Sequence, residues 1–281
     1  MKKEELVSAA PYLRSKDTTA TIMRDVVFAL LPAAGYEIYR FGFRVFLLLL
    51  LSVTSCVLAE HVWKSFRKIQ NGGYECSAVV TGLLLGMILP ADAPCWLPVA
   101  GGVFAILVVK MAFGGLGRNL LNPAAATGCM GFMIAGFFMK DISSESLEPG
   151  PFPLLLGGLY LILRKVISIR VPAAYLLSYA VVTILAGGNG LDLEWLMMQI
   201  CNGSLMLGAF FMANDDTTSP MTNVGKLIFG VLLGVLTGVF QLVMCTPAAV
   251  VCAVVAGNLP VPLIEKMTFP KSFGKGKKAN I

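Results

Sequence analysis

Residues 114–124 read Gly-Gly-Leu-Gly-Arg-Asn-Leu-Leu-Asn-Pro-Ala and lie between two apolar segments. This stretch is too polar and too rich in glycine to be a membrane helix, so it separates helical segments on either side. Its glycines, Gly114, Gly115 and Gly117, allow the backbone to approach a ligand or another part of the chain closely. The rest of the chain can be placed around this break.

The second half of the stretch carries groups that could bind a ligand. Asn119 and Asn122 are three residues apart, so their amides would share one face of a helix. Pro123 suits the first turn of the following helix, where Arg118 and the free backbone amides would favour an anionic or hydrogen-bonding ligand. The alternative is a tight turn between two membrane helices, and the residues alone leave both interpretations open.

The composition is that of an integral membrane protein. The chain has 281 residues, of which 57% are hydrophobic and 14% charged, and its mean hydropathy is +0.78. In a typical soluble domain, about a quarter of all residues are charged. The seven cysteines include no C-x-x-C pair, and no nucleophile–base pair or nucleic-acid surface is recognisable. We therefore expect no catalytic centre or metal site in this chain alone, and no nucleic-acid partner.

Hydrophobic periodicity predicts ten segments. They comprise residues 25–39, 41–60, 77–90, 94–113, 121–139, 152–164, 171–187, 195–213, 224–244 and 246–264. A helix that crosses the hydrocarbon core needs about 20 residues. The third segment and the apolar end of the eighth, residues 205–213, are too short for this, so protein or a cavity must surround them.

The two short segments are each third in a set of five, which predicts an inverted repeat. Gly82 and Pro94 also fall 126 residues before Gly208 and Pro220. Short segments at corresponding places indicate a site at the interface between repeats. We thus expect an all-α membrane protein with an inverted repeat of five plus five segments. Its expected parts are a cytoplasmic N-terminal segment (1–24), a first repeat with an outer loop (25–151), a second repeat (152–264) and a basic cytoplasmic tail (265–281).

Charge placement predicts the orientation. With ten crossings, 19 of the 22 lysines and arginines fall on one side of the membrane, and only Arg40, Arg44 and Lys140 fall on the other. Positively charged residues concentrate on the cytoplasmic side of membrane proteins. Both termini are therefore expected in the cytoplasm.

A second polar cluster occupies residues 212–223, after the short eighth segment. Its adjacent carboxylates, Asp215 and Asp216, are accompanied by four hydroxyl groups, including that of Thr218. These groups could cap a half-helix, hydrogen-bond a polar ring system or bind a cation. The alternative is an ordinary turn that caps the ninth helix.

Four stretches together resemble the D subunit of Rnf-type electron-transport complexes, which is related to the B subunit of sodium-translocating NADH:quinone reductases. These stretches are residues 11–19, 77–85, 114–124 and 211–220. The resemblance covers nearly the whole chain, in order. It implies a urea-transporter-like fold and a membrane electron-transfer subunit of a multi-subunit complex. That complex couples electron transfer between ferredoxin and NAD to sodium or proton translocation.

The resemblance also implies partners, a location and cofactors. Partners would be other membrane and peripheral subunits, including flavin and iron–sulfur subunits, together with membrane lipid. The location would be the cytoplasmic (inner) membrane of a bacterium or archaeon. Riboflavin or FMN would be bound non-covalently near the Asn-x-x-Asn pair. The candidate cofactor-binding residues are Gly114, Gly115, Gly117, Arg118, Asn119, Asn122, Asp215, Asp216 and Thr218.

The chain departs from the family in the loop of residues 140–152. Family members carry FMN linked through its phosphate to a threonine there, but this loop contains no threonine, and Pro149 stands in that position. A covalent FMN is therefore not expected, and Ser146 is the fallback attachment site. Two other functions fit the predicted architecture: a channel or carrier for a small polar solute, and a membrane scaffold subunit without flavin.

Overall fold

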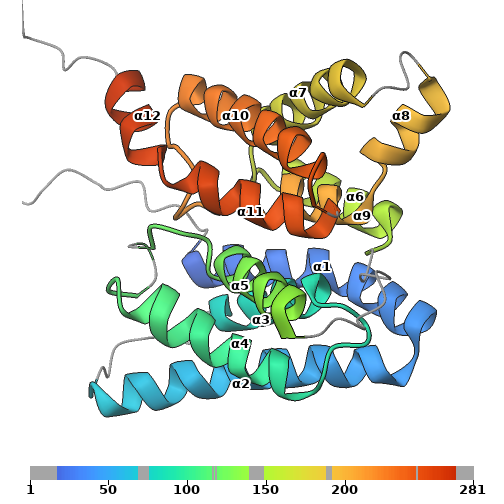
Figure 1. Cartoon of the computed structure of the whole chain (residues 1–281). Coiled ribbons are helices and arrows are strands. Elements are labelled where there is room, and N and C mark those ends of the chain that lie inside the picture. The colour runs from blue at the N-terminus through green and yellow to red at the C-terminus, as the bar shows by residue number, and fades with distance from the viewer. Residues whose placement is uncertain are drawn as a thin grey trace, which may run out of the picture.

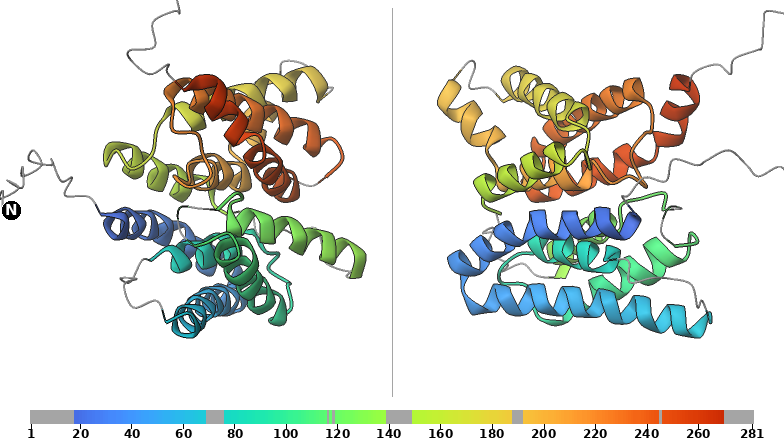
Figure 2. Two further views of the ribbon diagram at one scale, coloured as in Figure 1. Left: turned by 90° about the vertical axis from the view of Figure 1, so that its left-hand side faces the viewer. Right: turned by 180° about the vertical axis from the view of Figure 1, so that it is seen from behind.

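The computed structural model describes residues 18–68, 76–115, 117, 119–138, 149–187, 192–244 and 246–269, with the backbone alone for 134–138. Within these residues the chain is helical and contains no strand. The elements separate into two stacked halves, with α1 to α5 in the lower half and α6 to α12 in the upper half (Figure 1). The same separation is seen from the side and from behind (Figure 2).

Each of the ten predicted hydrophobic segments contains at least one helix. The first half consists of α1 Thr19–Phe41, α2 Phe43–Phe66, α3 Ser77–Ile88, α4 Trp96–Phe104, the π-helix η1 Ala105–Met111 and α5 Pro123–Phe138. The second half consists of α6 Pro151–Leu163, α7 Arg170–Ala186, α8 Leu193–Ile200, α9 Gly203–Leu207, the π-helix η2 Gly208–Met212, α10 Asn223–Gln241, α11 Thr246–Asn258 and α12 Val261–Thr268.

Two of the predicted segments, the eighth and the tenth, each contain a bend between separate helices. The eighth bends by 50° between α8 and α9, where the Asn202 side chain accepts hydrogen bonds from the backbone N–H groups of Ser204 and Leu205 and so caps a new helix. The tenth also bends by 50°, between α11 and α12. Pro260 lies at this break and has no N–H to continue the helix.

Helix length limits which elements can cross a membrane unaided. Among the described residues, α2 and α10 are long and apolar enough, and each bent pair adds one more candidate if it counts as a single span. Helix α3, with 12 residues, is short, as is the α9–η2 piece. The structure is thus an all-helical membrane protein with two to four candidate spans by length and composition.

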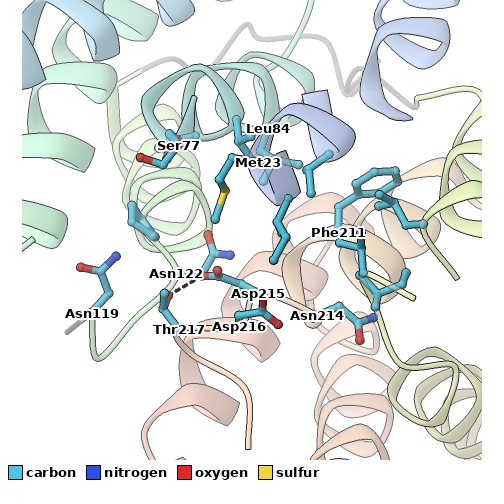
Figure 3. A pocket seen from close by; sticks show the side chains of 18 of the residues that line it. Met23, Ser77, Leu84, Asn119, Asn122, Phe211, Asn214, Asp215, Asp216 and Thr217 are labelled. Carbon is cyan, nitrogen blue, oxygen red and sulfur yellow. Dashed lines mark hydrogen bonds between the residues drawn. The ribbon is translucent and has the colours of Figure 1, made fainter. Parts of the chain in front are cut away.

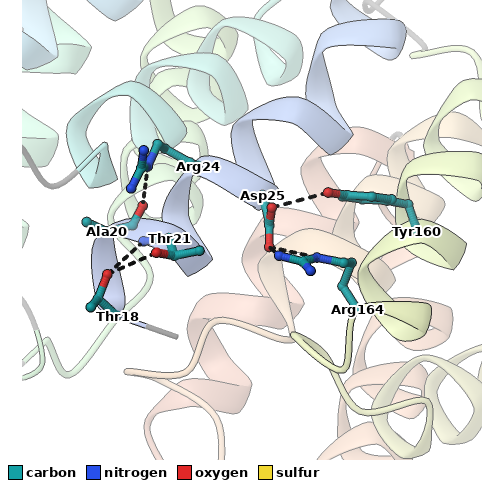
Figure 4. Close-up of polar contacts among 7 residues, drawn as sticks. All are labelled: Thr18, Ala20, Thr21, Arg24, Asp25, Tyr160 and Arg164. Carbon is teal, nitrogen blue, oxygen red and sulfur yellow. Dashed lines mark hydrogen bonds and ion pairs between the residues drawn. The ribbon is translucent and has the colours of Figure 1, made fainter. Parts of the chain in front are cut away.

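The halves meet along two helix pairs, α1 with α6 and α5 with α11. In the first pair, the Asp25 carboxylate accepts hydrogen bonds from Tyr160 Oη at 3.2 Å and from Arg164 Nη2 at 2.9 Å (Figure 4). In the second pair, Cys129 Sγ lies 3.0 Å from Cys252 Sγ. These two helix pairs thus bring into contact residues that are more than 120 positions apart in the sequence.

We predict that Gly157→Ala loosens the contact between α6 and α1. A Cβ atom at Gly157 would lie 2.3 Å from the carbonyl oxygen of Ala29, a backbone atom that cannot move without shifting α1. Overpacking of this kind costs about 1–3 kcal/mol. The variant should therefore unfold at a lower temperature in detergent. Gly35→Ala is the matched control, because nothing lies within 4 Å of its Cβ position; equal melting temperatures would contradict this packing.

Candidate functional site

The glycine-rich turn after η1 requires its glycines. Gly114, Gly115 and Gly117 have φ angles of 108°, 90° and 87°, a region that other residues rarely adopt. The turn is closed by backbone hydrogen bonds from Gly114 N to Met111 O and from Gly115 N to Lys110 O, both 3.1 Å long. These glycines therefore shape the turn that leads to the two asparagines.

Asn122 links the two halves of the molecule and begins helix α5. Its Oδ1 accepts hydrogen bonds from Ala124 N at 3.0 Å and Ala125 N at 3.2 Å, while its Nδ2 donates to Met212 O at 3.3 Å. Its backbone N–H donates to the side-chain oxygen of Asn258 at 3.0 Å once that amide is oriented to satisfy both its groups. Asn122 thus acts as a helix cap and as a tie to the second half.

Asn119 is buried against the glycine turn. With its amide oriented in the same way, Nδ2 donates to Lys110 O at 3.2 Å and to Gly115 O at 3.1 Å. The amide oxygen then faces away from these two carbonyls. The predicted pair therefore lines one wall, with much of its hydrogen-bonding capacity already used inside the protein.

A cavity of about 70 Å³ lies where the two halves meet (Figure 3). One part of its wall is apolar and comes from α1, α3, the start of α5, α6 with the turn that follows it, and η2. The residues of this part are Ile22, Met23, Val26, Val80, Leu84, Pro123, Leu161, Val166, Ile167, Phe210 and Phe211. The other part is polar and comprises Ser77, Thr81, Lys110, Asn119, Asn122, Asn214, Asp215, Asp216 and Thr217.

The carboxylates after η2 form the edge of this polar wall. Asp215 Oδ2 accepts hydrogen bonds from Thr217 Oγ1 at 2.9 Å and from Thr218 Oγ1 at 3.3 Å. Burial raises the pKa of the Asp215 carboxyl, and the pKa of Asp216 is raised by burial and by the neighbouring Asp215 charge.

The N-cap of α10 is Thr222, whose Oγ1 accepts a hydrogen bond from Gly225 N at 3.0 Å. The carboxylates themselves are therefore not needed to cap that helix.

A buried ion pair supports the same wall. Lys110, on the π-helix η1, donates from Nζ to Glu60 Oε2 at 2.6 Å and to Ser77 Oγ at 2.7 Å. The other oxygen of Glu60 pairs with Lys64 at 2.7 Å. Only 2% of Lys110 is exposed. The Lys110 cation beside the cavity is thus held by groups from α2 and α3.

The cavity brings four of the predicted residues together: Asn119 and Asn122 from the first half, and Asp215 and Asp216 from the second. Gly114, Gly115 and Gly117 form the adjacent turn, and Thr218 is buried behind Asp215. Arg118 and Ser146 lie outside the described residues.

Sequence reasoning missed Lys110 and Glu60 as site residues. Both are charged groups within predicted hydrophobic segments, and such residues in membrane segments usually face the protein interior and have a function. That signal would have found Lys110. The pairing could not be read from sequence, since the residues are 50 positions apart.

These features define an all-helical membrane protein with a mixed polar and apolar cavity between two halves. The chain belongs to the NQR2, RnfD, RnfE family, which matches residues 6–141 and 130–274. It is 34% identical to the D subunit of the Na(+)-translocating ferredoxin:NAD(+) oxidoreductase complex of Acetobacterium woodii, over 96% of each chain. It is 29% identical to the D subunit of the proton-translocating ferredoxin:NAD(+) oxidoreductase complex of Clostridium ljungdahlii, over 95% of this chain and 96% of the relative. The resemblance seen in the sequence motifs is thus confirmed.

We predict that breaking the buried ion pair from one side destabilises the protein more than removing it entirely. Glu60→Gln leaves the Lys110 charge buried without its counter-ion, which costs about 3–5 kcal/mol. Adding Lys110→Met should restore part of this loss. Melting temperatures of the single and double variants in detergent measure the coupling. Lys64→Met, which removes the more exposed partner of the same carboxylate, is the control and should cost about 0–1 kcal/mol; additive effects would argue against the pair.

Proposed function

We propose that this chain is the D-type membrane subunit of an ion-translocating ferredoxin:NAD oxidoreductase complex, located in a bacterial inner membrane. It passes electrons through a non-covalently bound flavin and completes no catalytic centre by itself. Two relatives that match nearly the full chain are named as this subunit of such complexes, one sodium-translocating and one proton-translocating. The partners are accordingly the other subunits of the complex.

The observation that supports the flavin proposal most strongly is that one part of the cavity wall is apolar and the other part is polar. An isoalloxazine ring has apolar faces and a hydrogen-bonding edge, and the cavity offers apolar side chains such as Phe211 opposite the amides and carboxylates. Bound there, a flavin would supply the ability to accept and pass on one or two electrons. The residues present thus fit this class of cofactor.

Binding would require the cavity to widen. Cofactor pockets have volumes of about 300–1000 Å³, well above the 70 Å³ observed. The turn that contains Asn119 and the loop that contains Asp216 border the cavity from opposite halves. Separation of these two segments would enlarge it.

The same proposal includes ten membrane crossings in two inverted repeats, with both termini in the cytoplasm. The short α3 and the short α9–η2 piece occupy corresponding places in the two halves and both border the cavity. This arrangement, with short helices meeting at the interface between repeats, is typical of transporter-type folds with a central site. The uneven distribution of lysine and arginine supports the orientation.

We predict that Asn122→Ala lowers the riboflavin or FMN content of the purified protein. Loss of one hydrogen bond to a buried polar ligand costs about 1–3 kcal/mol, or roughly 5- to 150-fold in affinity. Flavin released by denaturation is measured by absorbance and mass spectrometry. Asn119→Ala should act in the same direction.

A second variant separates flavin binding from helix capping. Asn122→Asp keeps an oxygen that can accept from Ala124 N and Ala125 N but lacks the Nδ2 donor, which also bonds to Met212 O. It should preserve the melting temperature better than Asn122→Ala. Full flavin occupancy in Asn122→Ala, Asn122→Asp and Asn119→Ala would assign these asparagines a structural role only.

We further predict that the chain carries no FMN linked through a phosphothreonine. The loop of residues 140–148 lies outside the described residues and contains hydroxyls only at Ser143, Ser144 and Ser146. The carboxylates of Glu145 and Glu148 would repel the phosphate of an approaching FMN. In-gel flavin fluorescence after denaturation should therefore be absent. A flavin-mass adduct on a peptide from this loop would refute the prediction, with Ser146 the first residue to examine.

A further inference from the structure

By exposed area, three carboxylates are buried in the described part of the chain, namely Asp25, Glu37 and Glu60, whereas Asp215 is half-buried. Asp25 accepts hydrogen bonds from Arg164 and Tyr160 (Figure 4), and Glu60 is paired with two lysines. Glu37 has no exposed surface, and neither of its oxygens has a hydrogen-bond partner. Two of the three buried acids are thus neutralised by cations, and the third is not.

Glu37 belongs to the protein-facing side of α1. It continues the buried stripe formed by Leu30, Ala33 and Ala34, at helical spacing. The same helix lines the cavity at its other end, through Val26 and its neighbours. Glu37 follows Asp25 by twelve positions, so the two residues lie about 18 Å apart along the helix axis. If α1 crosses the membrane as proposed, with Asp25 at one surface, Glu37 lies within a hydrocarbon core that is about 30 Å thick.

The helices that pack against α1 bring no counter-ion to Glu37. These helices are α2, α3 and α6. Helix α3 contains no ionisable residue, and α6 contains only Tyr160, which is bonded to Asp25. The ionisable groups of α2 are Arg44, Cys56, Glu60, His61 and Lys64.

The two arginines nearest to Glu37 in the sequence are directed elsewhere. Arg44, just after the α1–α2 turn, donates from its guanidinium to the backbone carbonyls of residues 91–93. On α1 itself, the guanidinium of Arg40 lies over the ring of Phe41, 5.0 Å from its centroid. Neither arginine donates a hydrogen bond to the Glu37 carboxylate.

An ionised carboxylate in such surroundings is strongly unfavourable, and no residue in the described part of the chain forms a hydrogen bond or ion pair with Glu37 that would offset its charge. A metal cation takes several oxygen ligands, and no polar group hydrogen-bonds to Glu37. A proton needs only the carboxylate itself. Ionisable residues within membrane segments mark ion pathways and proton relays.

We propose that Glu37 is a proton-binding site, at which the carboxylate takes up a proton to form the neutral acid and later releases it. This inference rests on two parts of the proposed function: α1 crosses the membrane, and the complex moves ions. It does not depend on a bound flavin. The site lies on the same helix as the cavity but at the opposite end.

The first test labels the purified wild-type protein with dicyclohexylcarbodiimide. This apolar reagent adds to protonated carboxyl groups: the O–H adds across a C=N bond, and the product rearranges to a stable acylurea without loss of any group. Peptide mass analysis should find the adduct at Glu37. Glu60 is the matched control, because it is buried but ion-paired, and it should remain unlabelled. Labelling at neither residue, or at Glu60 alone, would overturn the proposal.

A comparison of two salts shows whether a proton or a sodium ion binds at Glu37. Labelling at Glu37 should proceed at the same rate in sodium chloride and in potassium chloride. Slower labelling in sodium chloride alone would mean that a sodium ion competes for the carboxylate, which would overturn the assignment of a proton site.

The second test uses Glu37→Gln in the whole complex, reconstituted in liposomes. Glutamine has the same shape but cannot exchange a proton, so ion uptake driven by electron transfer from ferredoxin to NAD should be lost. Bound flavin should be unchanged, which distinguishes this result from a failure of the flavin site. Unchanged ion uptake would overturn the proposal and would mean that Glu37 contributes only to packing. If the variant does not assemble, the wild-type labelling still decides the proposal.

Discussion

The contact between α1 and α6 holds the two halves of the molecule together. Gly157 allows α6 to approach the backbone of α1 at Ala29, and the ion pair between Asp25 and Arg164 closes one end of this contact. In a membrane, apolar surfaces gain little by leaving lipid, so association depends on close packing and on polar bonds between helices. The α1–α6 pair uses both. The cavity exists because this contact and the α5–α11 contact fix the distance between the halves.

Short helices between these contacts create the polar site. Helices α3 and α9–η2 begin or end inside the protein, so the chain around them exposes backbone groups and polar side chains to the cavity rather than to lipid. Asn122 satisfies some of these groups by bonding to Met212 O from the other half. Lys110 is placed beside the cavity by a π-helix, a form found frequently at functional sites. The short helices and the π-helix η1 thus each contribute groups to the site.

The sequence predicted the positions of the helices better than their interactions. Hydrophobic periodicity located all ten helical segments, because apolar runs are local features of the chain. The breaks at Asn202 and Pro260 depend on single residues inside such runs, and the hydrophobic pattern distinguishes only the short apolar end of the eighth segment, residues 205–213. The asparagines were predicted to meet a ligand, but whether an amide faces a ligand or a carbonyl is decided by tertiary packing, as the bond from Asn122 to Met212 illustrates. The pair of Glu60 with Lys110 and the isolation of Glu37 likewise depend on contacts between distant segments.

The thiols of Cys129 and Cys252 are sensitive to the distance between the two halves of the molecule. They lie on α5 and α11, and their sulfur atoms are 3.0 Å apart, close enough for a disulfide to form after a small movement. Any event that draws these helices apart would slow oxidation of this pair, and any event that presses them together would speed it. The rate at which this disulfide forms in the native chain therefore measures changes in the distance between the two halves, without an added probe or an engineered residue.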